Sequence, residues 1–140
     1  MLHKKRKLLK NQKGFTLIEL LAVIVILAII AAIAIPAIGH IIKNSHIDGD
    51  KSDAVQVINA AKLYVSQKGI PSEALSITEL DPYLDDEVNL SEISVSVTED
   101  ETTGKVTYAL TANGKYVTFK NATLTDINNS PKGATEVPKK

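Results

Sequence analysis

The sequence KGFTLIE, residues 13–19, joins a basic segment to a long apolar one. Residues 20–38 then read LLAVIVILAIIAAIAIPAI, without a charged or strongly polar side chain. As a helix at ~1.5 Å per residue, this run spans roughly 28 Å, close to the ~30 Å hydrocarbon core of a bilayer. A core helix of a small soluble domain would carry a polar stripe, and this run has none. The run therefore predicts a membrane-spanning segment.

The charge of the chain is unevenly distributed. The 140 residues hold 16 basic and 16 acidic side chains, a formal net charge of zero. Residues 1–14 carry six of the basic residues and no acid, which leaves ten basic against 16 acidic residues in the remainder. The basic cluster predicts a cytoplasmic N-terminus and places residues 43–140 outside. The acidic remainder argues against a nucleic-acid binder that works through bulk positive charge.

A secretory signal peptide is the alternative reading of this N-terminus. Ala32-Ile33-Ala34 offers a small-x-small pattern of the kind that signal peptidase cuts. The apolar run continues past that site without a polar region, which favours the membrane segment.

The heptapeptide and its surroundings closely resemble the N-terminus of type IV prepilins and pseudopilins. Four features are combined: a basic leader, Gly14 before the apolar Phe15, Glu19 four residues later, and an uncharged segment of membrane length. The resemblance extends through about Lys68, roughly the first half of the chain. It implies no enzymatic activity and no cofactor, but a subunit that other proteins process and assemble.

The resemblance implies a defined maturation. A prepilin peptidase cuts after Gly14 and methylates the new N-terminus at Phe15. An assembly ATPase and a platform protein then move subunits from the membrane into a helical homo-oligomeric filament on the cell surface, with the apolar helices inside and the heads outside. DNA or surfaces are conceivable partners of such a filament.

Glu19 is the residue of this segment with the sharpest physical interpretation. A carboxylate costs up to about 2.5–3.5 kcal/mol at the centre of a membrane and less at the interface, so it is a functional candidate. The amine created at Phe15 by cleavage can pair with Glu19 of a neighbouring subunit, and loss of either charge leaves the other unpaired. Alternatively, Glu19 lies among lipid headgroups near the N-terminus of the helix, where the helix dipole stabilises a negative charge.

Two residues late in the apolar run weaken its helix. Pro36 removes a backbone hydrogen bond, and Gly39 lowers helix propensity three residues later. The resemblance implies a segment that bends or melts on filament assembly; a simple kink at the membrane exit is the alternative.

An amphipathic helix is predicted to follow the membrane segment. Apolar residues at the spacing of one helical face run from Ala54 to Val65, and Gly69 with Pro71 gives a stop signal. We expect one long helix over residues 15–68, about 80 Å if unbroken. Asp48-Gly49-Asp50-Lys51-Ser52-Asp53 does not match a calcium loop and is interpreted as a solvated break or an N-terminal cap. No metal site is predicted.

The rest of the chain predicts a small antiparallel sheet. Ser76-Ile77-Thr78-Glu79 reads as a capping box in a connecting segment over residues 70–90. In residues 91–125, apolar and polar side chains alternate, which predicts a three-stranded sheet. Asn113-Gly114 is predicted to form a two-residue turn that pairs Leu110 with Val117 and Tyr108 with Phe119. The apolar face of this sheet should pack against the apolar face of the helix over residues 54–65. Residues 126–140 are predicted to be a flexible tail.

The expected organisation is therefore an α+β, pilin-like chain. It comprises a removed leader (1–14), a transmembrane and filament-core helix (15–42), an amphipathic helix (43–69), the connecting segment, the sheet and the tail. The chain has no cysteine, whereas many pilins of double-membrane bacteria close the C-terminal region with a disulfide. Cysteine-free heads are more typical of Gram-positive pilins.

Three functions remain open from the sequence. They are a subunit of a type IV pilus for adhesion or motility, a pseudopilin for DNA uptake in competence or for secretion, and a single-pass anchored or secreted protein that does not polymerise. Histidines at positions 3, 40 and 46 form no catalytic constellation with a nucleophile, and no phosphate-binding loop is present.

Overall fold

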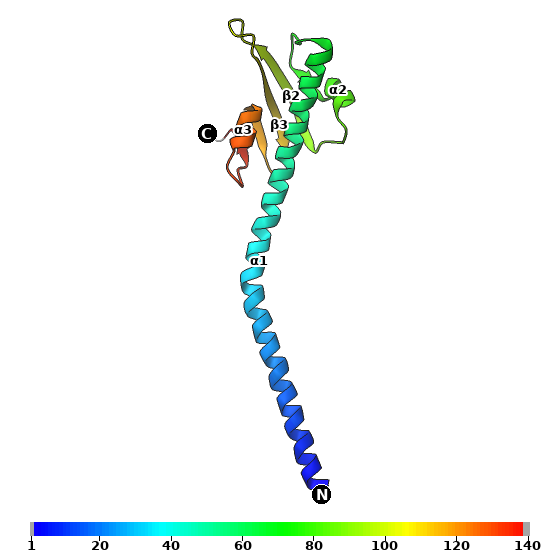
Figure 1. The fold of residues 1–140 in the computed structure, drawn as a ribbon, viewed down its shortest axis with the longest axis vertical. Coiled ribbons are helices and arrows are strands. Elements are labelled where there is room, and N and C mark those ends of the chain that lie inside the picture. The colour runs from blue at the N-terminus through cyan, green and yellow to red at the C-terminus, as the bar shows by residue number, and fades with distance from the viewer. Residues whose placement is uncertain (1, 139–140) are drawn as a thin grey trace. The chain divides into compact units, whose positions relative to one another are not determined.

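The computed structural model describes the backbone of residues 2–138 and the side chains of residues 15–138. The chain divides into two compact units, Met1–Ile41 and Ile42–Lys140. Helix α1 (Leu2–Lys68) supplies all of the first unit and the first helix of the second, which we call the head (Figure 1).

The head contains a five-stranded sheet in the order β1-β2-β3-β4-β5. The strands are β1 (Leu75–Ser76), β2 (Leu90–Glu99), β3 (Val106–Gly114), β4 (Thr118–Ala122) and β5 (Glu136–Val137). Neighbours pair antiparallel except β4 and β5, which are parallel. The α+β arrangement of a long helix on an antiparallel sheet is confirmed. The three strands predicted within residues 91–125 are β2, β3 and β4. Strands β1 and β5 were not predicted, because they have two residues each and are too short to show an alternating pattern.

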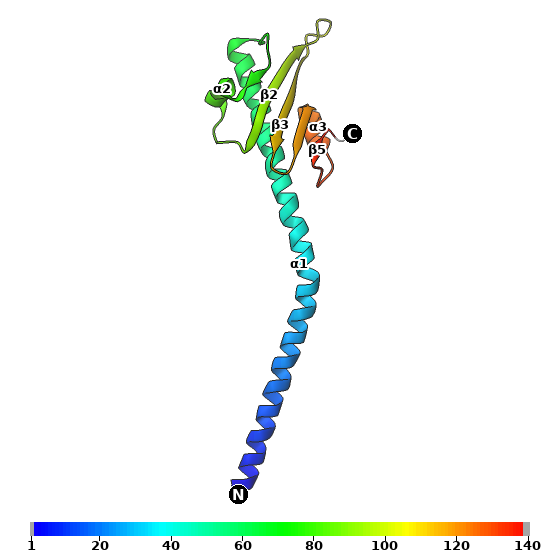
Figure 2. The ribbon, with the colours of Figure 1, turned by 180° about the vertical axis from the view of Figure 1, so that it is seen from behind.

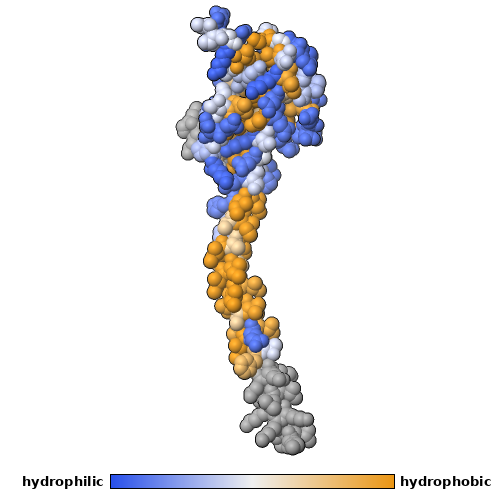
Figure 3. All heavy atoms as spheres, viewed as in Figure 1, coloured by the Kyte–Doolittle hydropathy of each residue, from blue (hydrophilic) through white to orange (hydrophobic). Residues whose placement is uncertain are grey.

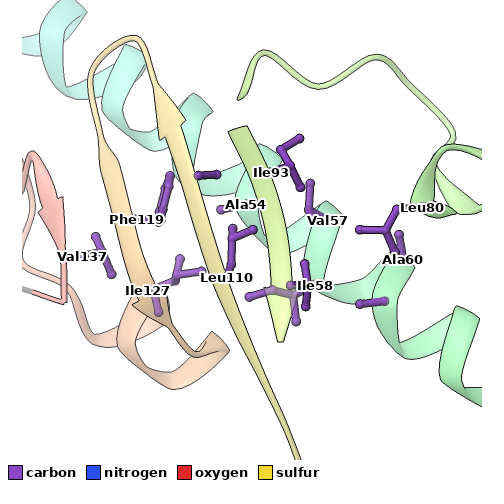
Figure 4. Close-up of a cluster of buried hydrophobic side chains, with 14 of the residues drawn as sticks. Ala54, Val57, Ile58, Ala60, Leu80, Ile93, Leu110, Phe119, Ile127 and Val137 are labelled. Atoms are coloured by element: carbon purple, nitrogen blue, oxygen red, sulfur yellow. The ribbon is translucent and has the colours of Figure 1, made fainter. Parts of the chain in front are cut away.

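The apolar face of α1 packs against the sheet, as predicted. Ala54, Val57, Ile58 and Ala61 are fully buried in one cluster with side chains of β2, β3 and β4 (Figure 4). The 3.6-residue period of the helix brings these positions onto one face, and the period of two does the same for the sheet. Burial of this shared face holds the head together.

The predicted register of the β3–β4 hairpin was wrong. Leu110 pairs with Ala122 and Ala112 with Phe119, with a register shift between the two pairs. Strand β3 continues through Asn113 and Gly114, which pair with β2, and residues 115–117 make the connection. The Asn-Gly signal was misread because this glycine serves a close backbone approach instead of a two-residue turn.

That close approach involves Asp50. Its side chain is 6% exposed, and its Oδ2 accepts hydrogen bonds from the backbone N–H groups of Tyr116 (2.7 Å) and Val117 (3.0 Å). The interpretation of residues 48–53 as a break or cap was wrong, because α1 continues through them. The carboxylate instead ties the β3–β4 connection to α1, across 66 residues of sequence.

Gly114 lies directly against this carboxylate. A Cβ atom at this position would stand 2.5 Å from Asp50 Oδ2 and 2.9 Å from the carbonyl oxygen of Val117. Both separations are below any ordinary contact distance, so a side chain would force the connection away from α1.

We therefore expect Gly114→Ala to lower the stability of the head by about 1–3 kcal/mol, the usual range for overpacking. Gly49→Ala is the matched control, since nothing lies within 4 Å of a Cβ there and alanine favours a helix by about 1 kcal/mol. Denaturation of the full chain in detergent, followed by tyrosine near-ultraviolet circular dichroism, would measure both. Equal stability of the two variants would contradict the close approach.

The connecting segment folds largely as predicted. Helix α2 (Ile77–Leu80) begins with a capping box, in which Glu79 Oε2 accepts the backbone N–H of Ser76 at 2.8 Å. A 3₁₀ turn η1 (Asp81–Tyr83) follows, with its proline in the first turn, where no hydrogen bond is lost. Asp53 of α1 accepts the backbone N–H of Asn89 at 3.0 Å, so a second carboxylate ties this segment to the helix.

The turn between β2 and β3 is organised by Asp100. Its Oδ1 accepts the backbone N–H groups of Thr102 (2.8 Å) and Thr103 (3.1 Å). The bond from Thr102, followed by that from Thr103, lowers the pKa of the exposed Asp100 carboxyl below its ordinary value.

The predicted flexible tail was wrong for residues 126–138. Helix α3 (Leu124–Asn129) begins at Thr123, whose side chain accepts the backbone N–H of Asp126. Ile127 and Val137 are buried in the core cluster, and Val137 pairs with Phe119. The composition of this segment is polar, but these two apolar residues are buried, and the backbone N–H of Thr118 donates to the carbonyl of Thr135 at 2.9 Å.

Candidate assembly segment

The first unit exposes a long apolar surface. Its large hydrophobic side chains from Phe15 to Ile38 are all at least half exposed, and Figure 3 shows the hydrophobic colour over most of the visible face of this part of α1. Within the described residues, α1 is the one helix long and apolar enough to cross a membrane, and its most apolar window is 0% buried. Such a surface requires a partner, either lipid or other helices.

Glu19 is the acidic residue of this apolar surface. It is exposed, one residue after Ile18 and one before Leu20, which are 67% and 54% exposed. Phe15 is four residues earlier and 69% exposed, so the two side chains share one helical face. Pairing of Glu19 with the N-terminal amine of a neighbouring copy stays a prediction. Gly14 and the leader lie outside the residues whose side chains are described.

Pro36 and Gly39 lie inside α1, which stays helical through both. A Cβ atom on Gly39 would meet nothing within 4 Å, so no neighbouring atom within the chain requires glycine there. Bending or melting of this segment stays a prediction.

Comparison with protein families bears directly on this segment. Residues 9–35 match the prokaryotic N-terminal methylation motif. This motif is the leader and helix start of type IV pilins, so the match supports the recognition of the chain as a type IV pilin or pseudopilin. No curated protein and no solved structure matches the chain.

The methylation motif includes Gly14, Phe15 and Glu19 but not Pro36 or Gly39. The roles of all five residues stay predictions. Among residues 15–138, no three His, Asp or Glu side chains are grouped closely enough to hold a metal ion. His46 stacks on Tyr116, with ring centroids 4.7 Å apart, next to the Asp50 hydrogen bonds.

Sequence reasoning missed the role of Asp50. Helical spacing could have revealed it, because Asp50 follows Ile47 by three residues and precedes Ala54 by four, both of which are fully buried. An acid in phase with the apolar stripe of an amphipathic helix is expected to be buried and hydrogen-bonded.

Proposed function

We propose that this chain is a prepilin, the structural subunit of a type IV pilus or a related filament. Prepilin peptidase cleaves it between Gly14 and Phe15 and methylates Phe15. The mature subunits leave the membrane and stack their apolar helices, with Glu19 of each subunit pairing with the N-terminal amine of a neighbour. The assembly ATPase, the platform protein and the peptidase are its partners in this process.

The match of residues 9–35 to the methylation motif carries the proposal. The exposed apolar surface of residues 15–38 supports it, because such a surface suits both storage in the membrane and burial in a filament core. Glu19 supports it further, since a carboxylate in a helix bundle is stable only when its charge is paired. The match is to a family of structural subunits, so we assign the chain no enzymatic role.

A pseudopilin of a competence or secretion system is the second candidate, because the methylation motif is shared by both kinds of filament. Electron microscopy of material sheared from cells distinguishes the two. Long filaments labelled by antibody to this chain indicate a pilus, and short or membrane-retained assemblies indicate a pseudopilus. Absence of any assembly would leave a single-pass anchored protein.

Gly14→Val should block maturation. The peptidase must approach the carbonyl of residue 14 closely, and a β-branched side chain obstructs that approach. We expect at least about a tenfold fall in processing, which corresponds to about 1.4 kcal/mol in the barrier. Mass spectrometry of membrane fractions would show the intact precursor instead of a chain that begins at Phe15.

A control for this prediction is the neighbouring substitution Gln12→Ala, which changes the leader without changing the cleavage site. Efficient processing of Gly14→Val would contradict the assigned site. A mature chain that begins at Ile35 would indicate a secretory signal peptide and refute the prepilin proposal.

A further inference from the structure

The Asn113-Gly114 pair is a feature of the head that the proposed function does not use. In an unfolded chain the backbone nitrogen of Gly114 can attack Cγ of the Asn113 side-chain amide. Glycine places no Cβ atom beside that nitrogen, so the approach is open. Asparagine followed by glycine is therefore readily converted to an acid wherever the backbone is free to turn.

The folded head holds the attacking nitrogen in a strand. Asn113 and Gly114 end β3, which lies beside β2 in Figure 2, and they pair with Ser91 and Leu90. The backbone N–H of Gly114 donates to the carbonyl of Val117 at 2.8 Å. Ring closure on Cγ requires rotation about the Cα–C bond of Asn113, away from the ψ of about +135° that an extended strand adopts. That rotation would break the pairing with β2.

The side chain of Asn113 is held as well. Its Nδ2 donates to Glu92 Oε2 at 2.6 Å, and its backbone carbonyl accepts the Ser91 hydroxyl at 3.1 Å. Nδ2 is the atom that leaves as ammonia, so attack would have to break this hydrogen bond. Asn113 is exposed, and water therefore reaches the site.

Asp50 controls the hydrogen bond at Gly114 through Val117. The Oδ2 atom of Asp50 accepts the backbone N–H of Val117 at 3.0 Å, and the carbonyl of Val117 accepts the N–H of Gly114. The Asp50 side chain is buried, so its hydrogen bonds are shielded from water. Loss of this carboxylate would release Val117 and, with it, the attacking nitrogen of Gly114.

We propose that Asn113-Gly114 is a deamidation site that Asp50 holds unreactive in the folded head and that reacts when the β3–β4 connection opens. Native proteins open locally without unfolding as a whole, and such an opening is sufficient here. The reaction would mark opened heads with a new negative charge at residue 113. Only the head is involved, so the reaction does not depend on the proposed filament function.

Water is the co-reactant, and nothing is oxidised or reduced. The nitrogen of Gly114 gives up its proton and forms a bond to Cγ of Asn113. The Cγ–Nδ2 bond breaks, ammonia leaves with that proton, and a cyclic succinimide remains. Water then opens the ring at either carbonyl, which leaves aspartate or isoaspartate at position 113.

The product is incompatible with the contact that Asn113 makes. A carboxylate at position 113 cannot donate to Glu92 Oε2, and two like charges would meet at hydrogen-bond distance. Glu92 already has a left-handed φ of 53° and lies in the register shift between Ser91 and Ser94 of β2. Deamidation would therefore weaken the pairing of β2 with β3 at this end.

Peptide mass analysis tests the site in the full chain. Trypsin cuts after Lys105 and Lys115, and the peptide between them has Asn113 as its single asparagine. The chain would be incubated in mildly alkaline buffer, either folded in detergent or unfolded in guanidinium. We expect conversion to be at least about tenfold faster in guanidinium, because the folded head must first open. Equal rates would overturn the protection, and no conversion in guanidinium would overturn the site.

Substitutions at Asp50 test its role. Asp50→Ala should speed conversion in the folded chain at least about tenfold, because the reactive open form becomes more populated. Asp50→Asn keeps an acceptor oxygen and should speed it less. Ile127→Ala is the matched control, since it removes a buried side chain of the core and leaves the Asp50 hydrogen bonds in place.

The variants would be compared at denaturant concentrations that give them equal free energies of unfolding. If Ile127→Ala then speeds conversion as much as Asp50→Ala, global unfolding exposes the site and the role of Asp50 is overturned. If Asp50→Ala does not fold, Asp50→Asn takes its place and has to exceed Ile127→Ala at equal stability.

Asn113→Asp tests the consequence of the reaction. It should lower the denaturation midpoint of the full chain, because the new carboxylate faces Glu92. Adding Glu92→Gln should restore most of the loss, since the glutamine amide can donate to the new acid. An unchanged midpoint in Asn113→Asp, or no recovery with Glu92→Gln, would overturn the destabilising effect.

Discussion

Glu19→Ala is expected to abolish filaments while the leader is still removed. The substitution leaves the N-terminal amine of the neighbouring subunit without its countercharge in an apolar bundle. Removal of one partner from a buried pair costs about 3–5 kcal/mol, and every subunit contact in the filament would lose that amount. Immunoblots of sheared surface material would show a loss of at least about a hundredfold, since about 2.7 kcal/mol already corresponds to that factor.

Two controls separate assembly from processing in this experiment. Mass spectrometry should find the same mature N-terminus at Phe15 in the variant and the parent chain. Asp48→Ala removes an acid of equal charge from an exposed position of α1 and should assemble normally. Filaments of normal abundance from Glu19→Ala would refute the pairing role and leave Glu19 as an acid at the membrane surface.

Asp50→Ala is expected to destabilise the head by about 2–4 kcal/mol. It removes the acceptor of two backbone hydrogen bonds, to Tyr116 and to the buried N–H of Val117. Each buried donor left unsatisfied costs about 1–3 kcal/mol. Denaturation monitored through tyrosine measures this loss in the full chain, because all four tyrosines lie in the head and the chain has no tryptophan.

Asp50→Asn distinguishes geometry from charge at the same position. Both hydrogen bonds end on one oxygen, Oδ2, so an amide oxygen can accept both and only the charge-assisted part is lost. We expect a smaller loss, about 1–1.5 kcal/mol. If Asp50→Ala and the exposed Asp48→Ala have the same stability, Asp50 does not hold the β3–β4 connection.

The features predicted correctly from the sequence are local or periodic. The capping box at Ser76 and the apolar stripe from Ala54 follow from spacings of three and four residues, which a helix converts directly into contacts. The predictions that failed concern contacts across long separations. Asn113-Gly114 signals a two-residue turn locally, but Gly114 lies against Asp50, 64 residues earlier in the chain, and no local pattern contains that approach.

Very short strands also could not be predicted from the sequence. Strands β1 and β5 have two residues each and exist only because β2 and β4 offer free edges to them. The segment after residue 126 has a composition typical of disordered chains, yet Ile127 and Val137 are both buried in the core cluster. Buried side chains and hydrogen bonds to β4 thus order a segment whose average composition is polar.

The sequence by itself determined the N-terminal segment. A basic leader, a glycine, one acid and an apolar run of membrane length are recognised from composition and helical spacing, and they need no partner from elsewhere in the chain. Only the tertiary structure showed which contacts hold the head together. A buried carboxylate on α1 accepts hydrogen bonds from a backbone donor 66 residues away, and two-residue strands form at both edges of the sheet. Such pairings depend on the whole fold, because desolvated charges and hydrogen-bonding groups take their partners from wherever packing places them.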